Sequence, residues 1–396
     1  MSPRTFDLKA LIRPNIWRLH PYRCARDDYS EGILLDANEN AYGPAIPPST
    51  LAATSTPPQS LARYPDPHHV PLKSALARFR NLASPNNVFL GVGSDEVIDL
   101  VMRVCCTPGK DKILICPPTY GMYSVSADIN DVAVVKVPLQ LAPDHVGFQL
   151  NVPGVLEALA RESDAIKVVF LCSPGNPTGS YLNQADIESI LNFDGWNGLV
   201  VVDEAYIDFV TGADTNGQPK QSTAALLGTY PNLLVSQTFS KSFGMAGARL
   251  GVAYASEDLI AVLSKTKAPY NISNPTAQLG MAAMSPEGLE QFADTIAKLN
   301  AQRERLLTEL PRLPRAGKVL GTNDANFVLM EVLDKEGKPC NKTAEALYKT
   351  LAEQYKVVVR FRGKEPGCFG CLRITVGTEK ENGVLLKQWQ EYFKNS

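Results

Sequence analysis

The chain has 396 residues, of which 44% are hydrophobic and 20% charged, and this length suits two domains or one large domain with a smaller satellite. The formal net charge of −2 gives no electrostatic reason to expect nucleic acid or an anionic membrane as a partner. No run of about 18 apolar residues occurs, and the N-terminus resembles neither a secretory signal nor a transit peptide. We therefore expect a cytoplasmic protein without a membrane-spanning segment.

Short apolar runs alternate with amphipathic segments through the middle of the chain. The runs lie at 88–90, 113–116, 132–137, 168–172, 199–202, 233–235 and 250–254, and helical spacing appears at 95–106 and 184–191. Continuous apolar runs predict strands that are buried on both faces, and helices between them predict crossovers in a mainly parallel sheet. We expect an α/β fold in which a large domain, residues 46–285, holds this sheet between helices.

The pattern changes after residue 285. A charged amphipathic segment predicts a long helix over 289–310, and a final helix is predicted over 383–393. Apolar runs at 327–332 and 357–360 lie between them. These features predict a smaller C-terminal α/β domain, residues 286–396. Residues 1–45 are rich in turn formers and are expected to form an N-terminal arm that packs with the small domain or a partner subunit.

The eight cysteines are scattered, and several lie inside apolar runs, a pattern typical of reduced thiols in a cytosolic protein. Cys368 and Cys371 form a CxxC pair with no second pair and no nearby histidine, so a zinc site is poorly supported. We interpret the pair as incidental thiols, with a redox pair as the alternative. The chain has four histidines, none in an HxxxH array, so no metal centre is expected.

Polar residues follow several of the predicted strands, where ligands bind in a doubly wound sheet. Gly93 and Ser94 open a helix whose free N–H groups suit a phosphate, although a capped helix start without a ligand is the alternative. Tyr120 is a candidate to stack on a flat heterocycle, against the plain reading of a core tyrosine. Asn176, in a turn fixed by prolines and glycines, can donate its amide to a phenolate oxygen.

Asp203 ends a buried strand, and Tyr206 follows three residues later. A carboxylate beside a pyridine nitrogen favours the protonated ring, and Tyr206 can reach a phenolate oxygen on the same ring. The competing interpretation of Asp203 is a Walker-B metal ligand. That interpretation is disfavoured because the chain has no GxxxxGK[ST] motif.

The segment 237–249 places Lys241 among small hydroxyl residues and Arg249 eight positions on. A lysine amine can form a Schiff base with the aldehyde of pyridoxal 5′-phosphate (PLP). Ser240 and Thr238 can bond the cofactor phosphate, and Arg249 can neutralise it with forked donors. The bland alternative is a surface lysine near an arginine.

These residues occur in the order and spacing of fold-type I PLP enzymes. The chain resembles the class I and II aminotransferases, and among them the histidinol-phosphate aminotransferase family. The strings that carry the resemblance are LDANENAYGP at 35–44, RYPD at 63–66, GSDE at 93–96, TYGMY at 119–123, the lysine segment at 237–249 and LRITVGT at 372–378.

The resemblance implies a fold-type I PLP-dependent transferase in which Lys241 is the Schiff-base lysine and proton carrier. The other cofactor-binding residues that it implies are Asp203 at the ring nitrogen, Asn176 and Tyr206 at the phenolate oxygen, Tyr120 on the ring, and Gly93, Ser94, Ser240 and Arg249 at the phosphate.

The resemblance also implies a homodimer with shared active sites, because Tyr64 matches a tyrosine that reaches the cofactor phosphate of the partner subunit. Arg373 matches an arginine that binds the glutamate carboxylate, and with Arg360 it would bind the phosphate of histidinol phosphate. Tyr22 and Asn38 match positions near the substrate. The segment 362–371 between the two arginines is an idiosyncratic loop, so the resemblance does not fix the geometry there.

The implied reaction is reversible amino transfer between L-histidinol phosphate and 2-oxoglutarate, in histidine biosynthesis. Two alternatives share the fold: an aminotransferase for aromatic amino acids, and a PLP-dependent lyase such as a threonine-phosphate decarboxylase. A transcription regulator with an aminotransferase-like domain is the third, and the short N-terminal arm leaves no room for its DNA-binding domain.

Overall fold

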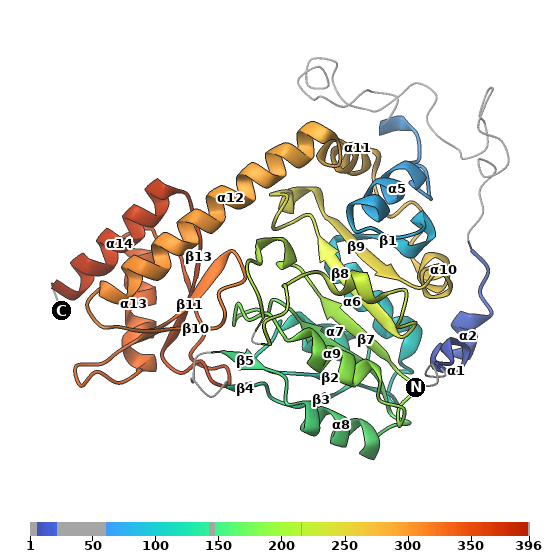
Figure 1. The fold of residues 1–396 in the computed structure, drawn as a ribbon, viewed down its shortest axis with the longest axis horizontal. Helices are drawn as coiled ribbons and strands as arrows, with labels where there is room; N and C mark the ends of the chain where they lie inside the picture. The colour runs from blue at the N-terminus through green and yellow to red at the C-terminus, as the bar shows by residue number, and fades with distance from the viewer. Residues whose placement is uncertain (1–5, 22–60, 142–146, 215, 395–396) are drawn as a thin grey trace.

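The computed structural model describes residues 6–21, 61–141, 147–214 and 216–394. At its centre lies a seven-stranded sheet in the order β1-β9-β8-β7-β6-β2-β3 (Figure 1). In chain order its strands are β1 (Val88–Val92), β2 (Lys112–Ile115), β3 (Ala133–Lys136), β6 (Ile166–Cys172), β7 (Leu199–Asp203), β8 (Leu233–Thr238) and β9 (Leu250–Ala255). Strand β9 is antiparallel to both its neighbours and the pairs from β8 to β3 are parallel, so the expected mainly parallel sheet is confirmed.

Helices cover both faces of this sheet. One apolar core lies between the sheet and α5 (Val70–Phe79), α8 (Val152–Arg161), α9 (Gln184–Leu191) and α11 (Asn274–Ala283). A second core lies against α1 (Leu8–Leu11), α2 (Pro14–Trp17), α6 (Gly93–Cys105), α7 (Met122–Ile129) and α10 (Glu257–Thr266). Successive strand residues alternate between the cores: Leu114 packs into the first, and Ile113 and Ile115 into the second. This two-sided burial explains why the strands read as continuous apolar runs.

The run at 132–137 differs from this pattern. Its strand, β3, is the last of the sheet and pairs only with β2 among the described strands. Ala133 and Lys136 are exposed, and Val134 and Val135 are half-buried. The expectation of burial on both faces was therefore wrong for this run, because an apolar sequence does not reveal which strand stands at the edge.

A smaller antiparallel sheet has the order β10-β11-β13-β12. Its strands are β10 (Ala316–Leu320), β11 (Phe327–Val332), β12 (Arg360–Phe361) and β13 (Cys371–Thr375). The helices α12 (Pro286–Glu309), α13 (Asn341–Glu353) and α14 (Glu379–Lys394) share a core with it, in which Trp389 and Leu347 are fully buried. Figure 1 shows α12 running from this sheet toward the helices of the large one. A short ribbon of β4 (Gln140–Leu141) and β5 (Phe148–Gln149) completes the strands.

Two element boundaries in this region differ from the sequence expectation. The last helix begins at Glu379 rather than at residue 383 because Thr378 and Glu381 cap each other: the Thr378 N–H donates to the Glu381 carboxylate at 2.8 Å, and the Glu381 N–H donates back to the Thr378 hydroxyl at 3.4 Å. Of the apolar run 357–360, only Arg360 enters a strand.

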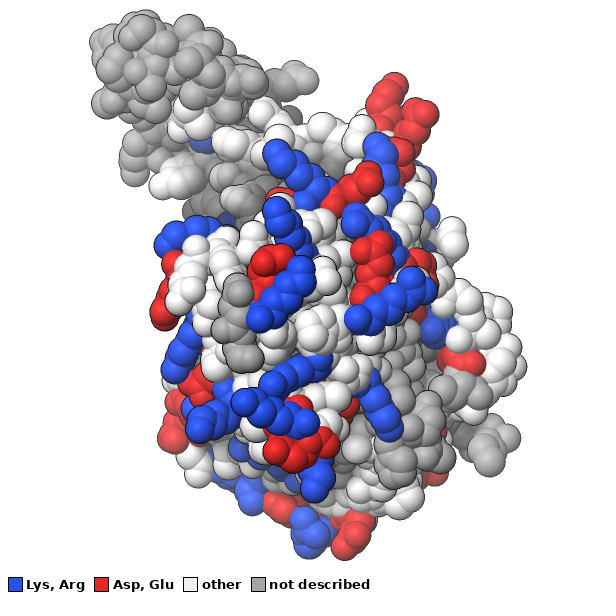
Figure 2. Space-filling view, turned by 90° about the vertical axis from the view of Figure 1, so that its left-hand side faces the viewer, with Lys and Arg blue, Asp and Glu red and all other residues white. Residues whose placement is uncertain are grey.

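The surface mixes both signs of charge. On the face that Figure 2 draws, lysine and arginine side chains are interspersed with aspartate and glutamate, in keeping with the formal net charge of −2. Within the described ranges, no helix combines the length and the apolar character needed to cross a bilayer.

Arg303 connects α12 to both sheets. Its side chain is 2% exposed, and its guanidinium donates to the carbonyl oxygens of Phe209, at 3.0 Å, and Ala325, at 3.1 Å. Phe209 follows β7 in the chain, and Ala325 precedes β11. A buried charge that satisfies two carbonyl groups in this way holds the helix at a fixed position relative to both segments.

We expect Arg303→Met to lower the apparent free energy of unfolding by about 2–4 kcal/mol, since both carbonyl oxygens lose a charged donor while remaining buried. Urea unfolding followed by circular dichroism measures the change. Lys298→Met on the same helix is the control: its ion pair with Asp294 is exposed, so the loss should stay within about 0.5 kcal/mol. Equal effects of the two substitutions would contradict this role of Arg303.

Candidate active site

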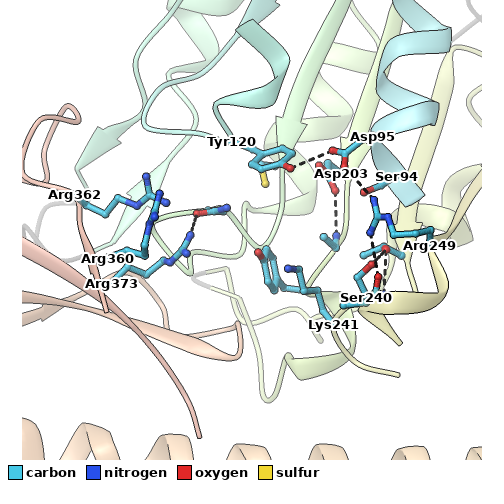
Figure 3. Close-up of a pocket in the computed structure, with 16 residues that line it drawn as sticks. Ser94, Asp95, Tyr120, Asp203, Ser240, Lys241, Arg249, Arg360, Arg362 and Arg373 are labelled. Atoms are coloured by element: carbon cyan, nitrogen blue, oxygen red, sulfur yellow. Dashed lines mark hydrogen bonds and ion pairs between the residues drawn. The ribbon is translucent and has the colours of Figure 1, made fainter. Parts of the chain in front are cut away.

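A cavity of about 460 Å³ opens where strands β6, β7 and β8 end and the small sheet approaches them. Figure 3 shows its lining: Arg360 and Arg373 of the small sheet and Arg362 of the loop after β12 on one side, Arg249 with Ser94 and Ser240 on the other, and Lys241 and Asp203 between them. Because the parallel strands end at the same edge and the antiparallel β9 begins there, residues as far apart in the chain as Ser94 and Arg249, 155 positions, meet here.

Lys241 follows β8 and directs its amine into the cavity, 5.9 Å from the centre of the Tyr206 ring. Partial burial lowers the pKa of this amine, and the positive charges of Arg373 and Arg249 lower it further, while Asp95 and Asp203 act in the opposite direction. A lysine with a lowered pKa holds more of the neutral amine near pH 7, which is the form that acts as a nucleophile or base.

A polar network fixes the backbone on either side of Lys241. The Ser242 hydroxyl donates to Asp208 at 2.7 Å, and Arg80 donates to the same carboxylate at 2.6 Å. Arg80 also donates to Gln237 at 2.9 Å, and Gln237 donates to the buried Glu204 at 2.8 Å. The lysine is thus held between two anchored residues, Gln237 and Ser242.

Asp203 is the most deeply buried charged group of the cavity, with 2% of its surface exposed. Its carboxylate accepts hydrogen bonds from the Tyr123 hydroxyl, at 2.7 Å, and from the Ala205 N–H, at 3.2 Å. Burial raises its pKa from 3.8 to about 6, although both hydrogen bonds act to lower it. Among the described residues no lysine or arginine forms an ion pair with Asp203. This buried carboxylate is therefore suited to a cationic group of a bound ligand.

Asn176 and Tyr206 lie next to Asp203. The Asn176 side-chain oxygen accepts a hydrogen bond from Arg373 at 2.5 Å, which orients its amide nitrogen away from that arginine. Tyr206 is 7% exposed and packs edge-on against Phe327, and burial raises the pKa of its hydroxyl. Tyr206 therefore stays a neutral hydrogen-bond donor across the physiological pH range.

The opposite end of the cavity is built to receive an anion. Ser94 lies in the first turn of α6, where backbone N–H groups are free of helical partners. Gly93 has a φ of +70°, and a Cβ there would stand 2.5 Å from the Arg249 guanidinium, so another residue would be strained and would displace that guanidinium. Ser240 accepts a hydrogen bond from the Thr238 hydroxyl at 2.9 Å, and Arg249 lies 3.4 Å from Asp95. This cradle of donors fits a phosphate group.

Arg360, Arg362 and Arg373 line the side of the cavity formed by the small sheet. Arg360 and Arg373 are paired residues of β12 and β13. The Arg373 guanidinium also lies over the Phe327 ring, 5.2 Å from its centre. Burial lowers the pKa of Arg373, and Arg362 and Arg360 lower it further, which shows that like charges are held close together here.

The cavity brings together ten of the site residues predicted from the sequence: Ser94, Tyr120, Asn176, Asp203, Tyr206, Ser240, Lys241, Arg249, Arg360 and Arg373. Gly93 supports this lining from the start of α6. Tyr22 and Asn38 lie outside the described residues. Tyr64 does not line this cavity: its ring is half-exposed in a separate groove, stacked on Tyr270 with ring centres 4.6 Å apart.

Three residues were not singled out by sequence reasoning. Tyr123 holds Asp203, and Asp95 accepts hydrogen bonds from both Tyr120, at 3.1 Å, and Arg249. Tyr123 stands three residues after Tyr120, so their helical spacing was the available signal. Arg362 lines the cavity from a loop without a recognisable pattern, and nothing in the sequence marked it.

Comparison with known proteins gives a consistent result. The family model for class I and II aminotransferases matches residues 30–388. A histidinol-phosphate aminotransferase of Schizosaccharomyces pombe is 50% identical to this chain, with 98% of this chain and 99% of the relative covered. One of Saccharomyces cerevisiae is 48% identical, covering 98% and 97%.

A solved structure is also similar. The crystal structure of a histidinol-phosphate aminotransferase from Sinorhizobium meliloti in complex with pyridoxal-5′-phosphate aligns with a TM-score of 0.72 at 24% identity. The alignment covers 96% of this chain and 97% of that one. At this identity the likeness concerns the fold.

The buried carboxylate leads to a pH-dependent stability. A carboxyl group whose pKa is raised on folding favours the folded state at low pH, and this contribution is lost as pH rises through the folded-state pKa of about 6. Between pH 5 and pH 8 the ligand-free protein should therefore lose about 1.5 kcal/mol more stability than its Asp203→Asn variant. Urea unfolding at both pH values measures this difference.

Asp194→Asn, at an exposed carboxylate, is the control and should follow the wild type. If the wild type and Asp203→Asn lost stability in parallel between the two pH values, Asp203 would not be a costly buried charge.

Proposed function

The chain belongs to the class I and II aminotransferases, and we propose that it catalyses reversible amino transfer between L-histidinol phosphate and 2-oxoglutarate, giving imidazole-acetol phosphate and L-glutamate, in histidine biosynthesis. The observation that carries the proposal is the single cavity in which an amine of lowered pKa lies between a buried carboxylate, a phosphate cradle and a group of arginines. The names of near-full-length relatives at 48–50% identity support the choice of substrate.

PLP is the cofactor of this family, and the cavity fits it at three points. The cradle at Gly93 suits its phosphate, Asp203 suits a cationic ring nitrogen, and Lys241 supplies an amine of suitable position. When bound, PLP supplies a reactive aldehyde carbon and a ring that accepts electron density. The remaining groups in the mechanism belong to residues of the protein.

The ring-binding residues act through charge and hydrogen bonding. The Asp203 carboxylate would keep the ring nitrogen protonated, and the hydroxyl of Tyr123 keeps that carboxylate oriented. The Asn176 amide and the Tyr206 hydroxyl would donate to the ring oxygen. Tyr120, whose hydroxyl is held by Asp95 at 3.1 Å, would stack on the ring.

The phosphate end anchors the cofactor. Backbone N–H groups at Gly93 and Ser94, the Ser240 hydroxyl and the Arg249 guanidinium would bind its oxygens. Asp95 lies between Arg249 and Tyr120, so it holds the phosphate-binding and ring-stacking groups in one arrangement.

Lys241 would carry the proton. Its lowered pKa favours the neutral amine, the form that would accept the proton from the α-carbon of the amino donor and deliver it again as a general acid. The site alternates between two substrates, so the kinetics would be ping-pong.

Arg373 and Arg360 would bind the acidic groups of both substrates. Glutamate presents carboxylates and histidinol phosphate presents a phosphate monoester, and a guanidinium fork binds either anion. Tyr22 and Asn38 are proposed near the substrate, although they lie outside the described residues.

We also propose a homodimer with shared sites. Tyr64 lies outside the cavity of its own chain, in an exposed groove with Tyr270, and this position is compatible with a role at the site of a partner subunit. We propose a division into the arm 1–45, the large domain 46–285 and the small domain 286–396. The seven described cysteines carry free thiols, which supports a cytoplasmic location.

The first test is a visible spectrum of the PLP-loaded protein before and after L-histidinol phosphate, without a keto acid. We expect the visible absorption band to collapse as the amino group is transferred. Lys241→Ala should bind PLP more weakly and turn over about 10³-fold more slowly or worse, because it lacks both amine and proton carrier.

Other outcomes of this test distinguish the alternatives. A band that ignores histidinol phosphate but responds to aromatic amino acids would overturn the substrate and keep the chemistry. Release of carbon dioxide from a phosphorylated amino acid would indicate a lyase. Lys241→Ala with wild-type turnover would contradict the assignment of the lysine.

The shared site is tested by mixing Lys241→Ala and Tyr64→Ala chains. If Tyr64 acts at the partner's site, a mixed dimer contains one complete site, because the Tyr64→Ala chain supplies Lys241 and the other chain supplies Tyr64. We expect activity about half that of the wild type per mixed dimer, above either homodimer. If Tyr64 acts within its own chain, no complete site forms and no recovery is seen.

A further inference from the structure

Arg362 is a third arginine on the small-sheet side of the cavity, beyond Arg360 and Arg373, which the proposed function assigns to the substrates. It lines the candidate active-site cavity with Arg360 and Arg373 (Figure 3). It also lines an adjoining cavity with Tyr120 and Asn176. Its position is fixed at the backbone, where its N–H donates to the Cys371 carbonyl oxygen at 2.9 Å. That bond extends the strand pairing of β12 with β13 by one step.

Only part of the Arg362 guanidinium has a hydrogen-bond partner among the described residues. One terminal nitrogen donates to Glu365 at 3.0 Å, and this pair is about three-quarters buried on each side. Its Nε is buried and has no hydrogen-bond partner among the described residues, and the same holds for the Nε of Arg373. Buried guanidinium nitrogens without partners are costly, and because both guanidinium groups belong to residues that line the cavity, an anion bound there would offset part of this cost through its charge.

The charges around this group do not balance. Arg360, Arg362 and Arg373 bring three positive charges to one side of the cavity, and Glu365 brings one negative charge. The mutual proximity of these arginines is unfavourable until an anion arrives. An excess of two positive charges matches a phosphate monoester dianion and exceeds what one carboxylate needs.

We propose that Arg362 is a specificity-determining residue that recognises the phosphate of the phosphorylated substrate, with Glu365 as the positioning residue that holds one arm of its guanidinium. The proposal rests on the proposed function and deepens it. A phosphate has three terminal oxygens and nearly two negative charges near neutral pH, whereas a carboxylate has two oxygens and one charge. The third arginine therefore favours the phosphate substrate over glutamate.

The principal test is Arg362→Gln, in which the two half-reactions are measured separately. The quantity of interest is kcat/KM for histidinol phosphate divided by kcat/KM for glutamate. We expect this ratio to fall about ten- to a hundredfold, the loss that follows from removing one charged hydrogen-bonding group from an anion. Arg362→Lys, which keeps the charge but loses the fork, should fall between the variant and the wild type.

Lys364→Gln is the matched control. Lys364 is exposed on the same loop and does not line the catalytic cavity. Its replacement by glutamine changes the net charge by the same amount as Arg362→Gln. An equal fall of the ratio in Lys364→Gln would overturn the proposal, because it would show a general effect of charge. An unchanged ratio in Arg362→Gln would overturn it as well.

A binding measurement gives a readout without catalysis. Inorganic phosphate is titrated calorimetrically into the PLP-loaded protein, in which the cradle at Arg249 is already filled. We expect Arg362→Gln to bind about tenfold more weakly or worse than the wild type. Glu365→Gln keeps an acceptor for Arg362 and removes the opposing charge, so it should bind at least as tightly as the wild type. Weaker binding by Glu365→Gln would contradict the role of the charge excess.

Failure of this inference is distinguishable from failure of the proposed function. Wild-type protein that does not convert histidinol phosphate overturns the proposed function itself. Wild-type protein that converts it, while Arg362→Gln keeps the wild-type ratio and phosphate affinity, overturns the role of Arg362 alone.

Discussion

The shared direction of strands β6, β7 and β8 is the constraint on which the site depends. Parallel pairing places the ends of all three strands at one edge of the sheet, so the loops with Asn176, Asp203 and Lys241 open side by side. Strand β9 runs the other way and begins at that edge, so Arg249, directly before it, lies beside the start of α6. A single antiparallel strand thus places Arg249 at the end of the cavity opposite the small sheet.

The cavity holds charges that the ligand-free protein does not neutralise. Asp203 is buried among neutral hydrogen-bond donors, and three arginines face one another with a single carboxylate beside them. Each arrangement is unfavourable alone, and each becomes favourable when a group of opposite charge is bound. Keeping these charges without partners lowers the stability of the ligand-free protein. A ligand of opposite charge restores that free energy when it binds, so ligand binding and protein stability are linked at this site.

The small sheet contributes to the chemistry through its position. Its strands β12 and β13 carry Arg360 and Arg373 as paired residues. Arg373 donates a hydrogen bond to Asn176, which lies in a loop of the large sheet. Arg303 of α12 bonds to carbonyl groups on both sides of the same junction. The distance between the arginines and Lys241 therefore depends on contacts that are remote from the chemistry.

The sequence by itself determined the kind of fold and indicated most of the residues that meet in the cavity. Continuous β-branched runs between helical segments specify a buried parallel sheet. Asp203 ends one of these strands and Lys241 follows another by three residues, so the local pattern places both near strand ends. Tertiary structure alone decided that β3 is an edge strand, that Tyr123 rather than a charged residue holds Asp203, and that Arg362 enters the cavity. These features arise from contacts between residues far apart in the chain, such as Tyr123 with Asp203, and local periodicity carries no information about which distant partner a side chain will meet.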